Sequence, residues 1–223
     1  MSPRVPETLD RRDAEPALVH RTLADLSVSN ALFGGRQAVR WGLTRLLAAT
    51  RANGPLSVLD VGAGMGDILL HVQRRLAPRW PLRPVAFDHL RPAARLCHDA
   101  GIPAAVGDLA HPPFGHGAVD VVVVSQVLHH LAPTAAAAFL RHISPLARVG
   151  VVVADLRRSP VAQAGIWTVS HLLGFHPVTR RDGVASVGYG FTAVELAALC
   201  REAGLSAQVA RRPGWRLVAW WSS

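Results

Sequence analysis

Three glycines at alternate positions follow a short apolar segment and form the part of the sequence best suited to ligand chemistry. In Val58-Leu-Asp-Val-Gly-Ala-Gly-Met-Gly66 the apolar residues lead directly into these glycines. Glycine lets the backbone turn tightly and approach a ligand without interference from a Cβ atom. A helix beginning after the turn directs its unpaired N–H groups into the same crevice. The segment therefore predicts a ligand site at the end of a buried strand.

The spacing of these glycines favours a ligand without phosphate. Dinucleotide sites use G-x-G-x-x-G and hold pyrophosphate at the helix N-terminus. This chain has G-x-G-x-G, and Asp67 stands where the third dinucleotide glycine would fall. A carboxylate repels pyrophosphate but is compatible with a cation. A methionine-derived sulfonium cofactor is cationic and carries no phosphate.

The basic residues exclude two classes of phosphate chemistry. The formal net charge is +9, and the chain contains arginine but no lysine. A lysine Schiff base with pyridoxal phosphate and a Walker-type phosphate loop are both excluded. The arginines occur as dispersed pairs without interleaved aromatic residues, which favours solvated faces over a nucleic-acid site.

Cysteine and histidine give no sign of a metal site. Cys97 and Cys200 are the only cysteines, and we expect both to be packed thiols. The eleven histidines show no metal-ligand spacing, so no metal is predicted. The charged N-terminus lacks the apolar core of a secretory signal, and no apolar stretch could cross a bilayer. These features predict a cytoplasmic protein.

Strands and helices alternate around the glycine turn, as expected for βαβ units and a parallel sheet. Helices are expected to follow the first two strands, ending near Leu76 and Ala100, and to cover Thr134–Ile143 and Ala193–Ala203. The last two strands are expected to form a hairpin around Pro213–Gly214. The expected strands are Val58–Val61, Pro84–Phe87, Ala104–Val106, Asp120–Ser125, Val149–Ala154, Ala207–Ala210 and Arg216–Trp221.

Two further regions flank this pattern. Residues 16–50 have apolar positions at helical spacing, broken at Gly34–Gly35, which predicts two helices in an N-terminal cap over residues 1–54. The main domain then covers residues 55–223. Within it, residues 156–191 fit neither period and form a packed insertion or a substrate lid, with a helix over Ile166–Phe175. For Trp220–Trp221 the sequence leaves two interpretations open, a dimer contact and core packing.

The segment VLDVGAGMGD resembles motif I of class I S-adenosylmethionine-dependent methyltransferases, and later motifs follow in the order of that family. The resemblance covers about residues 55–221. It implies a doubly wound, Rossmann-like α/β fold, with a seven-stranded, mostly parallel sheet and an antiparallel C-terminal strand. It also implies S-adenosylmethionine as the cofactor.

The resemblance assigns the cofactor site residue by residue. Asp60 would orient the methionine end, Asp88 would hold the ribose hydroxyls, and Asp108 would receive the adenine amino group. The cofactor-binding residues implied are Asp60, Gly62, Ala63, Gly64, Gly66, Asp88, His89, Gly107, Asp108, Leu109, Ser125 and Gln126.

The acceptor side is less defined. His129 and His130 follow the fourth strand, near the transferable methyl, and either could act as a general base. Their pattern also occurs across methyltransferases with different substrates, so this role stays open. Asp155, Arg157 and Trp167 are expected at the acceptor pocket. Arg157 could pair with an anionic substrate group or lie exposed.

The segment after the fourth strand narrows the class of molecule that could accept the methyl group. It reads Ser125-Gln-Val-Leu128, without the Asn/Asp-Pro-Pro-aromatic motif of amino-directed nucleic-acid methyltransferases. The pattern resembles small-molecule enzymes of quinone pathways and of polyketide or phenol modification. We therefore expect O- or C-methylation of a small hydrophobic, aromatic or polyketide-type molecule in secondary metabolism. Alternatives are an RNA methyltransferase that uses the arginine excess and a non-catalytic, cofactor-binding partner protein.

Overall fold

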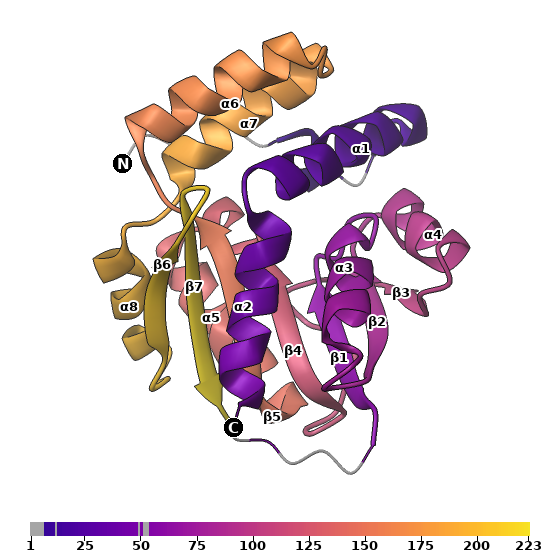
Figure 1. Cartoon of the computed structure of the whole chain (residues 1–223), viewed down its shortest axis with the longest axis vertical. Helices are drawn as coiled ribbons and strands as arrows, with labels where there is room; N and C mark the ends of the chain where they lie inside the picture. Colours follow the sequence, from indigo (N-terminus) through magenta and orange to yellow (C-terminus); the bar gives the residue numbers. More distant parts are fainter. Residues whose placement is uncertain (1–6, 12, 49, 51–53) are drawn as a thin grey trace.

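The computed structural model describes residues 7–11, 13–48, 50 and 54–223 and has a seven-stranded sheet at its centre (Figure 1). The order is β3-β2-β1-β4-β5-β7-β6. Strands β1 to β5 are parallel, and β7 runs antiparallel to both of its neighbours. This confirms the doubly wound, mostly parallel sheet. The strands are β1 Leu56–Val61, β2 Leu82–Asp88, β3 Ala104–Val106, β4 Val119–Ser125, β5 Ala147–Leu156, β6 Gln208–Arg212 and β7 Arg216–Ser222.

Helices cover both faces of the sheet and explain its continuous apolar strands. Val121–Val124 in β4 are fully buried because each face of the strand meets a helical layer. One core packs α5 (Pro133–Ile143) and α8 (Ala193–Glu202) against the sheet. The other core holds α2 (Gly35–Leu47), α3 (Asp67–Leu76) and α4 (Arg91–Asp99).

The two N-terminal helices have different positions, which the expected common cap did not anticipate. Helix α1 (Pro16–Leu32) lies near the carboxyl edge of the sheet, whereas α2 packs across its face over β5 and β7 (Figure 1). Gly42 permits this close packing, because a Cβ atom there would lie 2.5 Å from Cγ1 of Val152. The apolar stripe of α2 therefore belongs to the main core.

Residues 156–191 form two helices that pack on each other, α6 (Pro160–Leu172) and α7 (Pro177–Tyr189). The expected helix over Ile166–Phe175 ends early, since Gly174 turns the chain with φ 64°. Helix α7 also contacts α1 (Figure 1). Its Gly183 and Gly188 and its charged Arg-Arg-Asp segment weaken the helical pattern in the sequence.

The C-terminal tryptophans belong to the core. Trp220 packs edge-on against Trp41 with ring centroids 5.1 Å apart, and the indole N–H of Trp221 donates to Ser144 Oγ at 2.9 Å. Cys97 and Cys200 are buried free thiols, as expected. The opening residues on which the secretory-signal prediction rests fall in 1–6, outside the described residues. In the part of the chain that is described, no helix has the length and apolarity needed to cross a membrane.

Replacing Gly42 with alanine tests the packing of α2. The added methyl meets two stiff, β-branched side chains on the sheet, so the free energy of unfolding should fall by about 1–3 kcal/mol. Gly165→Ala in α6 is the matched control, because nothing lies within 4 Å of its Cβ position. It should leave stability unchanged or raise it by up to about 1 kcal/mol. Urea unfolding measures both, and equal effects would contradict the close packing.

Candidate functional site

A cavity of about 610 Å³ lies at the carboxyl ends of the parallel strands. Its floor comes from the segments that follow β1, β2 and β4. Residues of α1, α6 and α7 close it from the other side. Clefts at this edge are the usual ligand sites of doubly wound sheets, because the strand order reverses there.

The glycine turn after β1 forms part of the cavity wall. Gly62 has φ 83°, and a Cβ atom there would lie 2.5 Å from Cγ2 of Val127. Its N–H donates to the Phe87 carbonyl at 2.8 Å, which fixes the turn beside β2. Gly62, Ala63 and Gly64 line the cavity. Their backbone is therefore accessible to a ligand, as a glycine cradle requires.

The third glycine of the turn has a packing role. Gly66 is not among the cavity-lining residues, and a Cβ atom there would lie 2.7 Å from Cδ1 of Ile102. Gly107 likewise lies outside the lining, and its Cβ position is 2.8 Å from the Phe87 ring. Both residues were expected to contact the cofactor. The structure instead uses their small size to let neighbouring elements approach.

Asp88 ends β2 with its carboxylate held by the backbone. Oδ2 accepts the N–H of Gly64 and Oδ1 accepts the N–H of Leu90, each at 2.9 Å. Burial raises the pKa of Asp88, and these amide bonds offset only part of that effect. The carboxylate lines the cavity with lone pairs to spare, so it can accept hydrogen bonds from ligand hydroxyls.

Asp60 and Ser125 present buried polar atoms without partners. Asp60 is 2% exposed, and its Oδ1 has no hydrogen-bond partner. Burial, followed by the charges of Asp67 and Asp88, raises the pKa of Asp60 to about 8. Ser125 Oγ is also unsatisfied, and both residues line the cavity. Such atoms call for a ligand, and a cation would favour the ionised form of Asp60.

The remaining expected cofactor residues lie along the same wall. His89, Leu109 and Gln126 line the cavity. Asp108 lines its margin, where Oδ1 accepts the Ala110 N–H at 3.0 Å. These positions suit the less buried end of a ligand that begins at Asp60.

His129 and Asp155 form a buried pair behind the cavity. His129 Nδ1 and Asp155 Oδ1 are 2.7 Å apart, and Asp155 also accepts the N–H groups of Leu128 at 3.0 Å and Leu156 at 2.7 Å. Burial alone would raise the pKa of Asp155, but the charge and hydrogen bond of His129 outweigh it, and the pKa is lowered. An ionised carboxylate only accepts, so Nδ1 carries the proton and Nε2 is left as the acceptor.

Asp155 therefore has a different place from the one expected. It is fully buried and is not among the residues that line the cavity, whereas His129 is. Asp155 orients His129 and does not contact the acceptor space itself. The sequence placed both residues near the fourth and fifth strands but could not show that they bond to each other.

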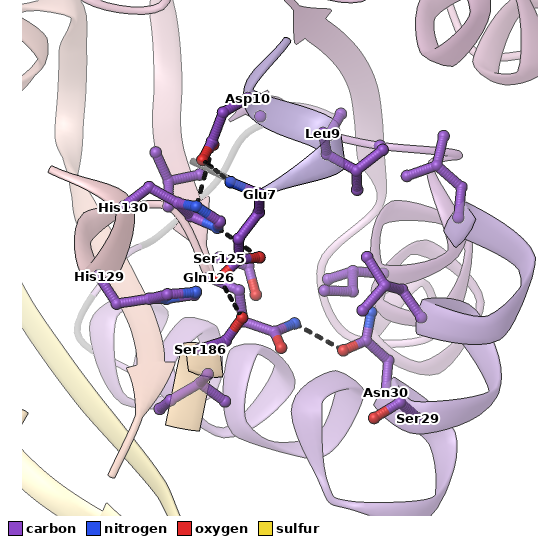
Figure 2. Close-up of a pocket in the computed structure, with 18 of the residues that line it drawn as sticks. Glu7, Leu9, Asp10, Ser29, Asn30, Ser125, Gln126, His129, His130 and Ser186 are labelled. Carbon is purple, nitrogen blue, oxygen red and sulfur yellow. Dashed lines mark hydrogen bonds and ion pairs between the residues drawn. The ribbon is translucent and has the colours of Figure 1, made fainter. Parts of the chain in front are cut away.

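His130 pairs with a segment far away in the sequence. Its Nδ1 lies 3.0 Å from Asp10 Oδ1 and its Nε2 lies 4.0 Å from Glu7 Oε2. Figure 2 shows the rings of His129 and His130 side by side, with the Glu7 carboxylate turned towards them. Burial would lower the pKa of His130, but the hydrogen bond with Asp10 and the charges of Glu7 and Asp10 raise it. His130 thus lines the cavity and also holds the segment that contains Asp10.

We call residues Glu7–Asp10 the strap. Glu7 Oε1 accepts from Ser186 Oγ at 2.5 Å, and the Thr8 N–H donates to Asp182 Oδ2 at 2.9 Å, both in α7. Glu7, Leu9 and Asp10 line the cavity. The sequence pattern did not single out these residues. The E-x-x-D spacing of a reciprocal capping turn was present, but no local signal showed where that turn packs.

Glu7, His129 and His130 also meet the spacing of a cation site. Each offers one ligand-type atom, and these atoms lie within 4.8 Å of one another. In the structure the Glu7 carboxylate already faces His130, whose pKa is raised. His130 lies closer to Asp10 Oδ1, at 3.0 Å, and burial raises the pKa of Glu7.

Of the two other residues expected at the acceptor pocket, one lines the cavity and the other does not. Arg157 lines it, and its backbone N–H donates to the Trp215 carbonyl at 2.8 Å. Trp167 is 56% exposed and lies on the outer side of α6 against His171. Its predecessor Ile166 lines the cavity instead, because successive helical residues point about 100° apart. The expectation for Trp167 is corrected accordingly.

A polar chain crosses the cavity from α1 to β7. Gln126 has φ 59° and donates from Nε2 to Asn30 Oδ1 at 2.6 Å, while its Oε1 accepts from Arg216 Nη1 at 2.7 Å. Asn30 and Arg216 both line the cavity. Neither was singled out from the sequence, since their partners come from distant segments.

Asp10→Asn tests the pairing of the strap with His130. Removing the carboxylate takes away the charge and hydrogen bond that raise the pKa of His130, so this pKa should fall in an NMR titration of the ring. In the wild type the pairing stabilises the fold below the unfolded-state pKa of histidine, and the stabilisation is lost as the pH rises through the raised value.

Asp13→Asn is the control for this change. Asp13 is exposed and, in the described part of the chain, forms its ion pair with Arg11, so its loss should leave the His130 titration unaltered. An unchanged pKa of His130 in the Asp10 variant would contradict the pairing.

The family comparison agrees with the central part of this fold. Residues 58–150 match a family described as a methyltransferase domain. These residues run from β1 into β5 and include the glycine turn, Asp88 and His129. No curated protein matches the chain.

Solved structures share the fold over nearly the whole chain. A methyltransferase dependent on S-adenosylmethionine from Aquifex aeolicus is 14% identical, with a TM-score of 0.60 over 92% of this chain and 97% of its own. Human N-acetylserotonin methyltransferase, in complex with S-adenosylmethionine, is 14% identical, with a TM-score of 0.65 over 92% of this chain and 56% of its own.

An O-methyltransferase from neocarzinostatin biosynthesis is 22% identical, with a TM-score of 0.63 over 92% of this chain and 57% of its own. Its structure holds S-adenosylmethionine and 2-hydroxy-5-methyl naphthoic acid. The chain thus spans little more than half of that enzyme and of the human one. At these identities the structures show the fold alone. Residues 58–150 are thus similar to a methyltransferase domain, and the chain shares its fold with solved S-adenosylmethionine-dependent methyltransferases.

Proposed function

We propose that the cavity binds S-adenosylmethionine and that the chain transfers its methyl group to a hydroxyl oxygen or an activated carbon of a small aromatic or polyketide-type molecule. The observation that carries this proposal is the His129–Asp155 pair, whose histidine faces the same cavity as the glycine turn and Asp88. A place in secondary metabolism and in the cytoplasm belongs to the same proposal and rests on the sequence.

The wall from Asp60 to Asp108 fits the methyl donor. The Gly62–Gly64 backbone leaves room for it, and the Asp88 carboxylate can accept from both ribose hydroxyls. The unsatisfied Oδ1 of Asp60 belongs to the same wall. An ammonium or sulfonium group bound beside it would favour the ionised form of Asp60. When bound, the cofactor supplies a methyl group activated for in-line displacement by its sulfonium leaving group.

The opposite wall supports an apolar acceptor. Leu26 from α1, Phe139 from α5, and Ile166, Phe175 and Val187 from the α6–α7 region line it. Such side chains exclude water from the reacting atoms and favour a ring system over a polar chain. We infer that residues 156–191 act as the acceptor lid, a role that also favours a small molecule over an RNA strand.

His129 has the geometry of a general base for a hydroxyl acceptor. The acceptor O–H would donate its proton to Nε2, while the acceptor oxygen bonds to the methyl carbon as the carbon–sulfur bond breaks. Asp155 keeps Nδ1 protonated and stabilises the imidazolium that results. This pair also supports a catalytic protein over a non-catalytic cofactor-binding partner.

Asp88→Ala tests the donor site. Calorimetric titration with S-adenosylhomocysteine should show wild-type binding and a roughly tenfold or greater loss in the variant, since a hydrogen bond to a charged group contributes about 1.5–3 kcal/mol. Asp99→Ala at the end of α4 is an exposed control and should bind normally. A folded wild type that binds neither S-adenosylhomocysteine nor S-adenosylmethionine would refute the donor assignment.

His129→Gln and Asp155→Asn test the base. For phenolic acceptors, kcat should fall by about 10²–10⁴ in the histidine variant, with binding of S-adenosylhomocysteine retained. Asp155→Asn should also lower kcat, because an amide can stabilise the tautomer that lacks the Nε2 lone pair. The loss should shrink for acidic phenols, which are already ionised.

His98→Gln, with an exposed imidazole, is the control and should retain wild-type turnover. Equal losses for acidic and weakly acidic phenols would argue against proton transfer to His129.

A further inference from the structure

Arg216 is a buried cation in the cavity wall whose charge the fold leaves largely unpaired. It is the first residue of β7, is 4% exposed and lines the cavity. Nε donates to the Phe33 carbonyl at 3.0 Å and Nη1 to Gln126 Oε1 at 2.7 Å. Both acceptors are neutral. These two hydrogen bonds use two N–H groups, and the guanidinium has further N–H donors besides them.

The described part of the chain supplies no carboxylate within ion-pair distance of Arg216. Asp155 is the acidic group that acts on it through space. The oxygens of Asp155 are committed to His129 and to the Leu128 and Leu156 amides. Burial lowers the pKa of Arg216 to about 10, against the opposing effect of Asp155. The side chain is therefore still cationic at neutral pH.

A buried charge is unfavourable unless a partner of opposite charge meets it. The position of Arg216 identifies where that partner would come from. Gln126 holds one edge of the guanidinium and is itself bonded to Asn30, as Figure 2 shows for the two amides. Arg216 lines the cavity, and so does Arg157, which follows the β5 residue Leu156 that is paired with Arg216.

We propose that Arg216 anchors a carboxylate-binding subsite inside the cavity. A planar guanidinium suits a carboxylate, because two parallel N–H groups match its two oxygens. The proposal rests on the proposed function and adds a requirement to it. The carboxylate comes either from the amino-acid end of the methyl donor or from the acceptor, which would then be an aromatic hydroxy acid.

Matched ligand pairs distinguish these two sources. The donor pair is S-adenosylhomocysteine and its decarboxylated analogue. The acceptor pair is 3-hydroxy-2-naphthoate and 2-naphthol, titrated into protein saturated with S-adenosylhomocysteine. Each ligand is titrated calorimetrically into the wild type, Arg216→Gln and Arg216→Lys. Arg158→Gln is the control, since Arg158 pairs with Glu195 and lies outside the cavity lining.

The expected result is a selective loss. Arg216→Gln should weaken one carboxylate ligand by about tenfold or more and leave its carboxylate-free partner within about twofold. Arg216→Lys should show a smaller loss, because lysine keeps the positive charge but cannot donate two parallel N–H bonds to one carboxylate. Selectivity in the donor pair assigns the donor carboxylate, and selectivity in the acceptor pair assigns a hydroxy acid.

A purely structural arginine predicts another pattern. If Arg216 only ties the Phe33 turn to β7, the variants lose thermal stability while both members of each pair change equally or not at all, and the proposal is overturned. Wild-type binding of S-adenosylhomocysteine reports separately on the proposed function. Should Arg216→Gln fail to fold, the lysine variant alone decides the outcome by the same comparison.

Discussion

Carboxyl groups removed from water at the ends of parallel strands impose the main constraint on this molecule. Each must find a donor, a proton or an opposite charge, because a lone buried anion is unstable. Asp155 finds His129 and two amides, and Asp88 finds the amides of Gly64 and Leu90. Asp60 finds no partner for Oδ1 and retains its proton to about pH 8. These different solutions divide one cavity into a wall that suits a cation and a wall that holds an oriented imidazole.

The features that the sequence predicts well are local ones. A buried strand, a glycine turn and the helix that follows are encoded within a few residues, so the order of strands and the positions of Asp60 and Asp88 could be anticipated. The orientation of Trp167 could not, because it depends on which face of α6 meets α7. The strap could not either, since Thr8 and its partner Asp182 are separated by 174 positions.

Strand direction explains why the sequence indicates Arg157 as a candidate site residue but not Arg216. In a parallel sheet, ligand-binding residues are expected at the carboxyl ends of the strands. Arg157 follows β5 at that edge. Strand β7 runs the opposite way, so its first residue, not its last, reaches the same edge. An antiparallel strand in a doubly wound sheet thus delivers its opening residue to the ligand side. Gln126 then joins that residue to α1 through Asn30.

The strap closes a long loop, because Glu7 bonds to Ser186 across 179 positions. The glycine turn, Asp88 and His129 all lie between these two residues in the sequence. Bringing such distant residues together costs loop entropy that contacts within the sheet must offset first. The α7 side of the cavity is therefore expected to close late in folding, after the sheet that forms its floor.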